Sequence, residues 1–401
     1  MHNDMKKILF AACILWGVIS CVHQQKGFTI RGNVSENIQG ARVYLITTGE
    51  VTDTLSSAIA SDSTFLLEGE VEEPCLCALI IDINEPGNET PDFRNKVIKT
   101  DFYLENSRID YRGDINTLPT YYYNPERTGK PIITGSKTED EQHAFKALIQ
   151  EENMMIGKLE KRYMDEYHLP SLEGKEVTQE GIDIVREKKT WEEKLRRKTL
   201  DYIKKNSQSV VAFDQASYII QGYSFPVTAT EMDSLANWLK QAWKDKERYN
   251  KLCQTVEQLR PLAIGEKYLD AEFVNPQGEK VTLSSLIPKG EYCMIEFWAS
   301  WCGLCRAEIP HLAKVHKRYP QFNIISISLD AKDSDWRKAM KEEGMVWTQL
   351  RNPDGMEGVT KDLYHIYAIP TCIILDQEGR FYRNNMRGAY LDEFLDTVFK
   401  K

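Results

Sequence analysis

The sequence predicts a multidomain protein with three regions of different fold class: an N-terminal all-β sandwich or barrel, a central α-helical region and a C-terminal α/β domain. Between about residues 28 and 135, apolar residues alternate with polar ones, which is the period of β-strands. Between 136 and 260 they follow the helical period. From 261 to 401, short apolar runs alternate with amphipathic segments. A length of 401 residues accommodates two or three domains.

The first 27 residues are expected to be a targeting segment and a tether rather than part of the fold. Two lysines precede an apolar run, Ile8–Ile19, that is shorter than the roughly 20 residues of a membrane-spanning helix. This pattern predicts a secretory signal peptide over residues 1–20. Cys21, which follows directly, resembles the lipidated cysteine of bacterial lipoproteins. The resemblance implies that Cys21 begins the mature chain, with residues 21–27 as the tether; an ordinary signal peptide cut elsewhere is the alternative.

Residues 28–135 are expected to form the all-β domain, because turn signals of Gly, Asn and Pro separate short alternating segments. The predicted strands are Phe28–Val34, Ala41–Thr48, Thr64–Val71, Leu76–Ile83 and Val97–Leu104. For Tyr121–Tyr123 we expect a loop that packs its rings on the sheet, with an exposed binding surface as the alternative.

Residues 136–260 are expected to form a helical spacer or bundle without catalytic residues. Thr138 and Glu141 match a capping box, and the helical period continues behind them to Tyr163. Further helices are predicted at Gly181–Lys205, Val210–Gln221, Thr230–Lys244 and Arg248–Arg260. Their charge runs are interpreted as solvated faces.

Residues 261–401 are expected to form the α/β domain. The predicted strands are Tyr268–Val274, Glu279–Leu283, Glu291–Trp298, Phe322–Leu329, Thr371–Leu375 and Arg380–Arg383. A first helix is expected to place Leu304, Glu308, Leu312, Val315 and Tyr319 on one largely apolar face. Further helices are predicted at Asp333–Glu343, Gly358–Tyr367 and Leu391–Phe399.

The chemistry is expected at Cys302 and Cys305, which follow the apolar strand directly and open the next helix. The free N–H groups and the positive end of a helix favour a thiolate there. The pKa of cysteines in C-x-x-C motifs is about 3.5–7.5. We therefore expect Cys302 to attack a disulfide and Cys305 to resolve the mixed disulfide. A zinc knuckle and a pair of core cysteines are the alternatives. The sequence has no second C-x-x-C, so neither a metal nor another cofactor is expected.

The stretch from Glu296 to Cys305, EFWASWCGLC, resembles the active-site motif of the thioredoxin superfamily. Glu308-Ile-Pro310 resembles the TlpA/ResA-like thiol–disulfide oxidoreductases. This resemblance covers residues 261–401 and implies a thioredoxin-like fold with an inserted element around Asp330–Gly355. It also implies that Trp301 and a cis-proline loop contact the substrate, and the loop residues are Ile369, Pro370 and Thr371. The β-rich domain resembles one that often precedes thioredoxin modules in secreted lipoproteins.

Two carboxylates are candidates for proton transfer. The resemblance implies that Glu296 is the buried acid of thioredoxins and that Glu308 is the acid near the dithiol of ResA-like proteins. A buried carboxyl group has a raised pKa and can exchange a proton near neutral pH. The alternatives are a Glu296 side chain on the opposite face of the strand and a Glu308 side chain on the helix surface.

These features together predict an exported, lipid-anchored oxidoreductase that reduces disulfide bonds in other exported proteins. Its anchor would attach it to a membrane of the cell envelope, with the thioredoxin-like domain in the periplasm. Because that compartment is oxidising, a membrane thiol donor would have to regenerate the dithiol. A disulfide isomerase or oxidase is one alternative, and a binding lipoprotein that uses the fold as a scaffold is another. A net charge of −9 without a basic patch argues against nucleic-acid binding.

Overall fold

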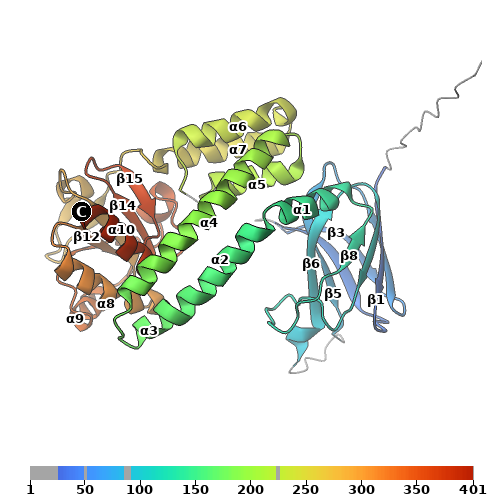
Figure 1. The fold of residues 1–401 in the computed structure, drawn as a ribbon, viewed down its shortest axis with the longest axis horizontal. Helices are drawn as coiled ribbons and strands as arrows, with labels where there is room; N and C mark the ends of the chain where they lie inside the picture. Colours follow the sequence, from blue (N-terminus) through green and yellow to red (C-terminus); the bar gives the residue numbers. More distant parts are fainter. Residues whose placement is uncertain (1–25, 49–51, 85–91, 223–225, 401) are drawn as a thin grey trace, which may run out of the picture. The chain divides into compact units, whose positions relative to one another are not determined.

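The computed structural model describes residues 26–48, 52–84, 92–222 and 226–400 (Figure 1). The predicted signal peptide and Cys21 lie outside these residues. The chain forms two units, residues 1–140 and 141–401. In the described part of the chain, no helix is both long and apolar enough to cross a bilayer.

The first unit contains two four-stranded sheets that share one apolar core. The sheet orders are β4-β1-β7-β8 and β3-β2-β5-β6. The strands are β1 Phe28–Val34, β2 Arg42–Thr47, β3 Thr54–Ile59, β4 Thr64–Gly69, β5 Cys75–Asp82, β6 Val97–Leu104, β7 Arg108–Gly113 and β8 Ile132–Thr134, with a 3-10 turn η1 at Phe93–Lys96. Alternate residues of both sheets point inward, among them Ile30, Val43, Leu79 and Ile109. The all-β prediction for this region is confirmed.

The five predicted strands are present, whereas β3, β7 and β8 were not predicted. These three strands are short or rich in polar residues, so their alternation is weak. The expectation that the rings of Tyr121–Tyr123 pack on the sheet is wrong, because Tyr121 is 55% and Tyr123 is 91% exposed. Tyr122 instead packs against Phe93, with ring centroids 5.8 Å apart, and Cζ of Arg94 lies 5.2 Å from the centroid of the Tyr122 ring.

The first helix, α1 Lys137–Leu148, begins earlier than the capping-box pattern predicts. The Ser136 hydroxyl accepts the backbone N–H of Glu139 at 3.1 Å, as an N-cap residue does. Thr138 lies inside the helix, and its hydroxyl donates to Glu105 at 2.8 Å. The predicted cap at Thr138 is therefore wrong, because a serine two residues earlier takes that role.

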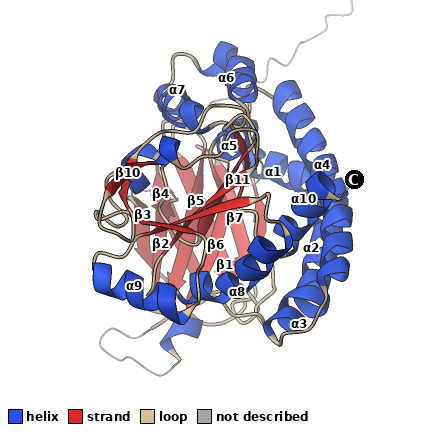
Figure 2. Cartoon of the chain, turned by 90° about the vertical axis from the view of Figure 1, so that its left-hand side faces the viewer, coloured by secondary structure: helices blue, strands red, loops and turns tan. Residues whose placement is uncertain are grey.

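The helical region of the second unit packs against the C-terminal domain. Its elements are α2 Gln150–Arg162, the π-helical turn η2 Tyr163–His168, α3 Leu169–Leu172, α4 Thr178–Lys205, α5 Val210–Ile220, α6 Ala229–Trp243, α7 Glu247–Leu259 and the 3-10 turn η3 Arg260–Leu262. The long helix α4 contacts both α2 and the last helix, α10 Ala389–Phe399, and the three helices lie close together in both views (Figures 1 and 2). Arg186 pairs with Asp396 at 2.9 Å and Lys189 pairs with Glu393 across the α4–α10 contact.

The C-terminal domain is a seven-stranded mixed sheet with the order β10-β9-β13-β12-β11-β14-β15. Its strands are β9 Glu272–Val274, β10 Lys280–Thr282, β11 Cys293–Trp298, β12 Asn323–Ser328, β13 Thr348–Arg351, β14 Thr371–Leu375 and β15 Phe381–Asn384. Its helical elements are η4 Leu283–Ser285, α8 Gly303–Arg318, α9 Asp333–Glu342, the π-helical turn η5 Val359–Leu363 and α10. Helix α9, which was predicted, and strand β13, which was not, lie in the region of the expected insertion around Asp330–Gly355. The predicted α/β class of this domain is confirmed.

Candidate active site

The two cysteines lie where the buried central strand meets the start of a helix. Every residue of β11 is buried, and the strand pairs in parallel with β12 and antiparallel with β14. Cys302 is the N-cap residue of α8, and its Sγ accepts the backbone N–H of Cys305 at 3.2 Å. This N–H and the positive end of the helix both favour a thiolate at Cys302.

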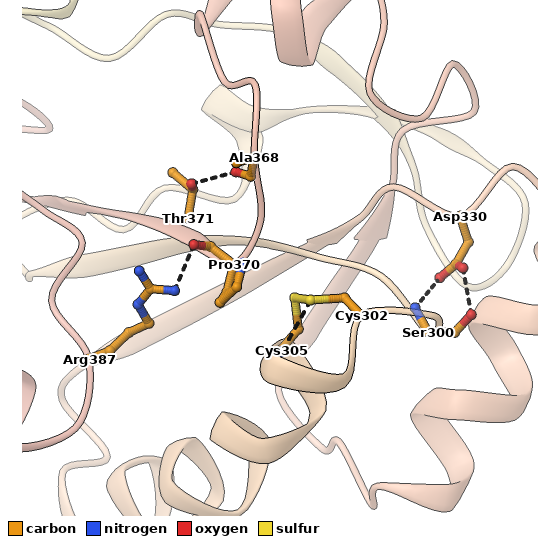
Figure 3. Close-up of a disulfide and its surroundings, with 8 residues drawn as sticks. All are labelled: Ser300, Cys302, Cys305, Asp330, Ala368, Pro370, Thr371 and Arg387. Atoms are coloured by element: carbon orange, nitrogen blue, oxygen red, sulfur yellow. Dashed lines mark hydrogen bonds between the residues drawn. A yellow bond between two sulfur atoms is a disulfide. The ribbon is translucent and has the colours of Figure 1, made fainter. Parts of the chain in front are cut away.

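Cys302 and Cys305 form a disulfide with a Cα–Cα distance of 5.3 Å (Figure 3). Cys302 is 8% exposed, whereas Cys305 is completely buried. Another sulfur can therefore approach Cys302 but not Cys305. This difference in exposure fits the predicted roles, in which Cys302 attacks and Cys305 resolves.

The loop that precedes β14 lies beside the disulfide. The Ile369–Pro370 peptide bond is cis, and Figure 3 shows Pro370 next to the two sulfur atoms. The Pro370 carbonyl accepts an N–H from Nη1 of Arg387 at 2.6 Å. The Thr371 hydroxyl donates to the Ala368 carbonyl at 2.8 Å. The predicted substrate-contact loop is thus at the dithiol, and Arg387, which the sequence reasoning missed, holds it.

A buried carboxylate that was not predicted fixes the turn before Cys302. Asp330 accepts the backbone N–H of Ser300 at 3.0 Å and the Ser300 hydroxyl at 2.6 Å (Figure 3). The Ser328 hydroxyl donates to the same carboxylate at 2.7 Å. Asp330 follows β12 and is only 2% exposed. Hydrogen bonds to Asp330 therefore link the ends of β11 and β12 directly beside the dithiol.

Glu296 is completely enclosed in the sheet. Its carboxylate accepts the Ser326 hydroxyl at 2.7 Å, and Ser326 accepts the indole N–H of Trp347 at 2.9 Å. Burial raises the pKa of Glu296 to about 7, the Ser326 hydrogen bond opposes this, and the nearby Glu308 carboxylate adds to it.

Glu308 lies on α8 one turn beyond Cys305 and has two hydrogen-bond partners. Its Oε1 accepts the backbone N–H of Gly388 at 3.0 Å and lies 2.9 Å from Nδ1 of His311. Burial by itself raises the pKa of Glu308. The hydrogen bond and charge of His311, together with the Gly388 N–H, nevertheless hold that pKa below its ordinary value. Glu308 is therefore a carboxylate at neutral pH, whereas Glu296 titrates there.

Three large apolar side chains are exposed in the segments that form the site: Trp301 at 64% and Leu304 at 76% beside the cysteines in sequence, and Tyr367 at 67%, three residues before Pro370. The expectation that Leu304 belongs to the apolar face of α8 is wrong. Cys305 and Ile309 define the buried face of this helix, and Leu304 lies about 100° around the helix from Cys305.

The remaining cysteines of this domain are packed inside it. Cys293 and Cys372 are completely buried, and burial raises the pKa of each thiol to about 12. The Cys372 thiol donates to the Met386 carbonyl at 3.2 Å. In the described part of the chain, no group of three or more His, Cys, Asp or Glu side chains is arranged to hold a metal ion.

Both domains match family models. Residues 290–381 match a family described as thioredoxin-like, and residues 28–142 match a domain of unknown function, DUF4369. The thiol-disulfide oxidoreductase ResA of Bacillus thuringiensis subsp. konkukian is 25% identical over 142 residues, which cover 35% of this chain and 79% of that protein. ResA of Oceanobacillus iheyensis is 32% identical over 101 residues, or 25% of this chain and 50% of that protein.

Solved structures are similar over the same share of the chain. The thioredoxin domain of a thiol-disulfide oxidoreductase from Bacteroides vulgatus is 28% identical, with a TM-score of 0.32. The match covers 34% of this chain and 96% of that one. A thiol-disulfide oxidoreductase from Bacteroides fragilis is 27% identical, with a TM-score of 0.32, over 33% of this chain and all of that one.

The C-terminal domain is therefore a thioredoxin-like redox domain. It is a thiol–disulfide oxidoreductase domain similar to the ResA proteins, and the β-rich domain that precedes it matches DUF4369. The predicted enzyme class, thiol–disulfide oxidoreductase, is confirmed.

Proposed function

We propose that this oxidoreductase is exported, is held at a membrane by lipid on Cys21, and reduces disulfide bonds in other exported proteins. The observation that carries the redox part is the disulfide at the start of α8, with Cys302 8% exposed and Cys305 completely buried. The signal-peptide pattern and the position of Cys21 support export and anchoring. The exposed side chains of Trp301, Leu304 and Tyr367 support a polypeptide as substrate. Exposed apolar side chains that cluster on a surface are typical of sites that bind other proteins.

The reaction begins with the reduced dithiol. The Cys302 thiolate attacks one sulfur of the substrate disulfide, the substrate S–S bond breaks, and its second sulfur leaves as a thiolate that takes up a proton. Glu296, as a carboxylate, accepts the proton of the Cys305 thiol. Cys305 then attacks the Cys302 sulfur, which releases the second substrate thiol and forms the Cys302–Cys305 disulfide. Two electrons have passed to the substrate, and a membrane thiol donor restores the dithiol by a second exchange.

Reduction of insulin tests the catalytic part of this proposal. The wild-type chain, supplied with dithiothreitol, is expected to accelerate insulin precipitation, and Cys302→Ser is expected to abolish the acceleration. Cys293→Ser, which removes a buried thiol of the same domain, is the matched control and should retain it. A wild-type rate equal to that of dithiothreitol alone would favour the binding-lipoprotein alternative.

Two further measurements test direction and location. A reduction potential near that of strong oxidants, about −120 mV, would contradict the reductase assignment, and a value near that of thioredoxin, about −270 mV, is expected. In bacterial cells that express the full chain, the protein is expected in the membrane fraction. Cys21→Ala is expected to move it to the fraction without membranes. An unchanged distribution would refute anchoring through Cys21.

A further inference from the structure

His311 joins two carboxylates that lie 84 residues apart in the sequence. Its Nδ1 is 2.9 Å from Oε1 of Glu308, and its Nε2 is 3.0 Å from Oδ1 of Asp392. A neutral imidazole carries one N–H and can donate to only one of these carboxylates, whereas the imidazolium donates to both. With both neighbours ionised as carboxylates, this geometry favours a protonated ring. Although burial by itself lowers it, the pKa of His311 is raised to about 10 by Asp392 and Glu308.

Helix α10 and the loop before it form the second part of this arrangement. The Gly388 N–H donates to the same Glu308 oxygen, and Asp392 is 8% exposed on the first turn of α10. Gly388 has a φ of +52°, in the left-handed region that favours glycine. A Cβ atom there would lie 2.8 Å from the Tyr163 hydroxyl oxygen, so a side chain at this position would force Tyr163 to move.

The helical region supplies the third part. The Tyr167 hydroxyl donates to Oδ2 of Asp392 at 3.4 Å, so one carboxylate receives Tyr167 on one oxygen and His311 on the other. Tyr163 packs on Tyr167 with ring centroids 5.1 Å apart. Both tyrosines belong to η2, and burial raises the pKa of each, so both remain neutral donors at any pH used for assay.

We infer that His311 is a positioning residue for the redox centre. It holds Glu308 as a fixed negative charge one helical turn from Cys305, and the helical region holds His311 through Tyr167 and Asp392. This inference rests on the proposed function only in taking the Cys302–Cys305 pair as the redox centre. It gives the helical region a role in the active site that the sequence did not suggest.

The charges around His311 link its protonation to the ionisation of the cysteines. His311 interacts directly with Glu308 on α8 and Asp392 on α10. These two carboxylates in turn interact with groups on β11, β14, η2 and the loop before α10, namely Glu296, Cys372, Tyr163, Tyr167 and Arg387. At neutral pH, His311 and Arg387 offset Glu308 and Asp392. Loss of the His311 charge leaves an excess negative charge beside the cysteines, which disfavours the thiolate.

The test measures the alkylation rate of Cys302 against pH in the reduced full chain, with iodoacetamide and peptide mass analysis. It requires no protein substrate, so it remains informative even if the reductase assignment fails. His311→Asn is expected to move the midpoint up by about half a pH unit or more, which slows alkylation at neutral pH about threefold. His311→Lys, which keeps a cation, is expected to restore much of the shift. Superimposable wild-type and His311→Asn profiles would overturn the inference.

Two comparisons separate positioning through Glu308 from a general structural effect. In a Glu308→Gln background, His311→Asn is expected to move the midpoint less than it does in the wild type, because the charge that His311 positions is already absent and only the loss of its own cation remains. An equal shift in both backgrounds would refute action through Glu308.

Tyr167→Phe is expected to shift the midpoint in the same direction as His311→Asn. Tyr249→Phe is the matched control, because that hydroxyl, also in the helical region, donates to the Ala236 carbonyl and not to this network, so the midpoint should not shift. If the Tyr167→Phe profile is identical to that of the wild type, the helical region does not act on the redox centre through Tyr167. Thermal unfolding of each variant identifies any that fail to fold.

Discussion

Asp330 accepts both the backbone N–H and the hydroxyl of Ser300, at 3.0 and 2.6 Å, two residues before Cys302. One buried carboxylate at the end of β12 thereby fixes the turn that delivers the nucleophile from β11. Ser328 adds a third donor, so both Asp330 oxygens are satisfied. The position of Cys302 thus depends on a contact that spans two strands.

Asp330→Ala is expected to lower the free energy of unfolding by about 1–3 kcal/mol, because it leaves buried donors without an acceptor. The rate of insulin reduction should fall as well, since the turn before Cys302 loses its anchor. Urea unfolding and the insulin assay measure the two effects. Asp335→Ala, at an exposed position on α9, is the control. Equal stability losses in the two variants would contradict the role given to Asp330.

Glu296→Gln is expected to remove the pH dependence of mixed-disulfide resolution near neutrality. In the wild type, the resolution rate should rise as pH increases through about 7, because the Glu296 carboxylate then accepts the Cys305 proton. The amide cannot accept it, so at pH 8 the variant should be slower by at least about tenfold, at the low end of general-base effects. Rapid-quench measurement of the mixed disulfide provides the rates. Glu308→Gln should keep the rise, and a rise that survives in Glu296→Gln would assign the proton to another group.

Glu296→Gln is also expected to stabilise the fold above neutral pH. The pKa of Glu296 is about 7 in the folded chain, above its ordinary value of 4.5. The wild type therefore loses stability as pH rises from about 4.5 through 7, by up to about 3 kcal/mol. The neutral amide does not share this loss. Urea unfolding at pH 5 and pH 8 should show the difference between the variant and the wild type growing with pH; a difference that does not change with pH would contradict the assignment.

Trp301→Ser and Leu304→Ser are expected to lower kcat/KM for insulin several-fold while barely changing the reduction of a small aromatic disulfide. Both side chains are more than half exposed, so their loss should change the free energy of unfolding by less than about 0.5 kcal/mol. Val346→Ser, which removes another highly exposed apolar side chain, is the control. If the two substrates respond equally, these side chains do not bind the polypeptide.

Local patterns in the sequence predict the elements that carry the chemistry. The apolar strand before Cys302, the C-x-x-C spacing and the Pro370 loop are each readable within a few residues. Leu304 and Thr138 show where such reading fails. The direction of a side chain around a helix depends on which face packs, and a cap depends on which hydroxyl reaches the free N–H groups.

The supporting contacts of the site could not be predicted, because they join residues distant in the chain. Asp330 meets Ser300 from the next strand, and His311 meets Asp392 across 81 positions. Nothing in the local pattern of Glu308 shows that an imidazolium holds it as a carboxylate, while Glu296 is left to titrate. That division follows from burial and from the partners that the fold supplies.

The parallel pairing of β1 with β7 affects how the N-terminal sandwich folds during synthesis. Phe28–Val34 leaves the ribosome early, yet its neighbour Arg108–Gly113 emerges almost eighty residues later. Until then, one edge of the earliest strand has no hydrogen-bonding partner, and such non-local closure is slow. Nascent chains of this oxidoreductase should therefore need protection from self-association most before β7 has been synthesised and has paired with β1.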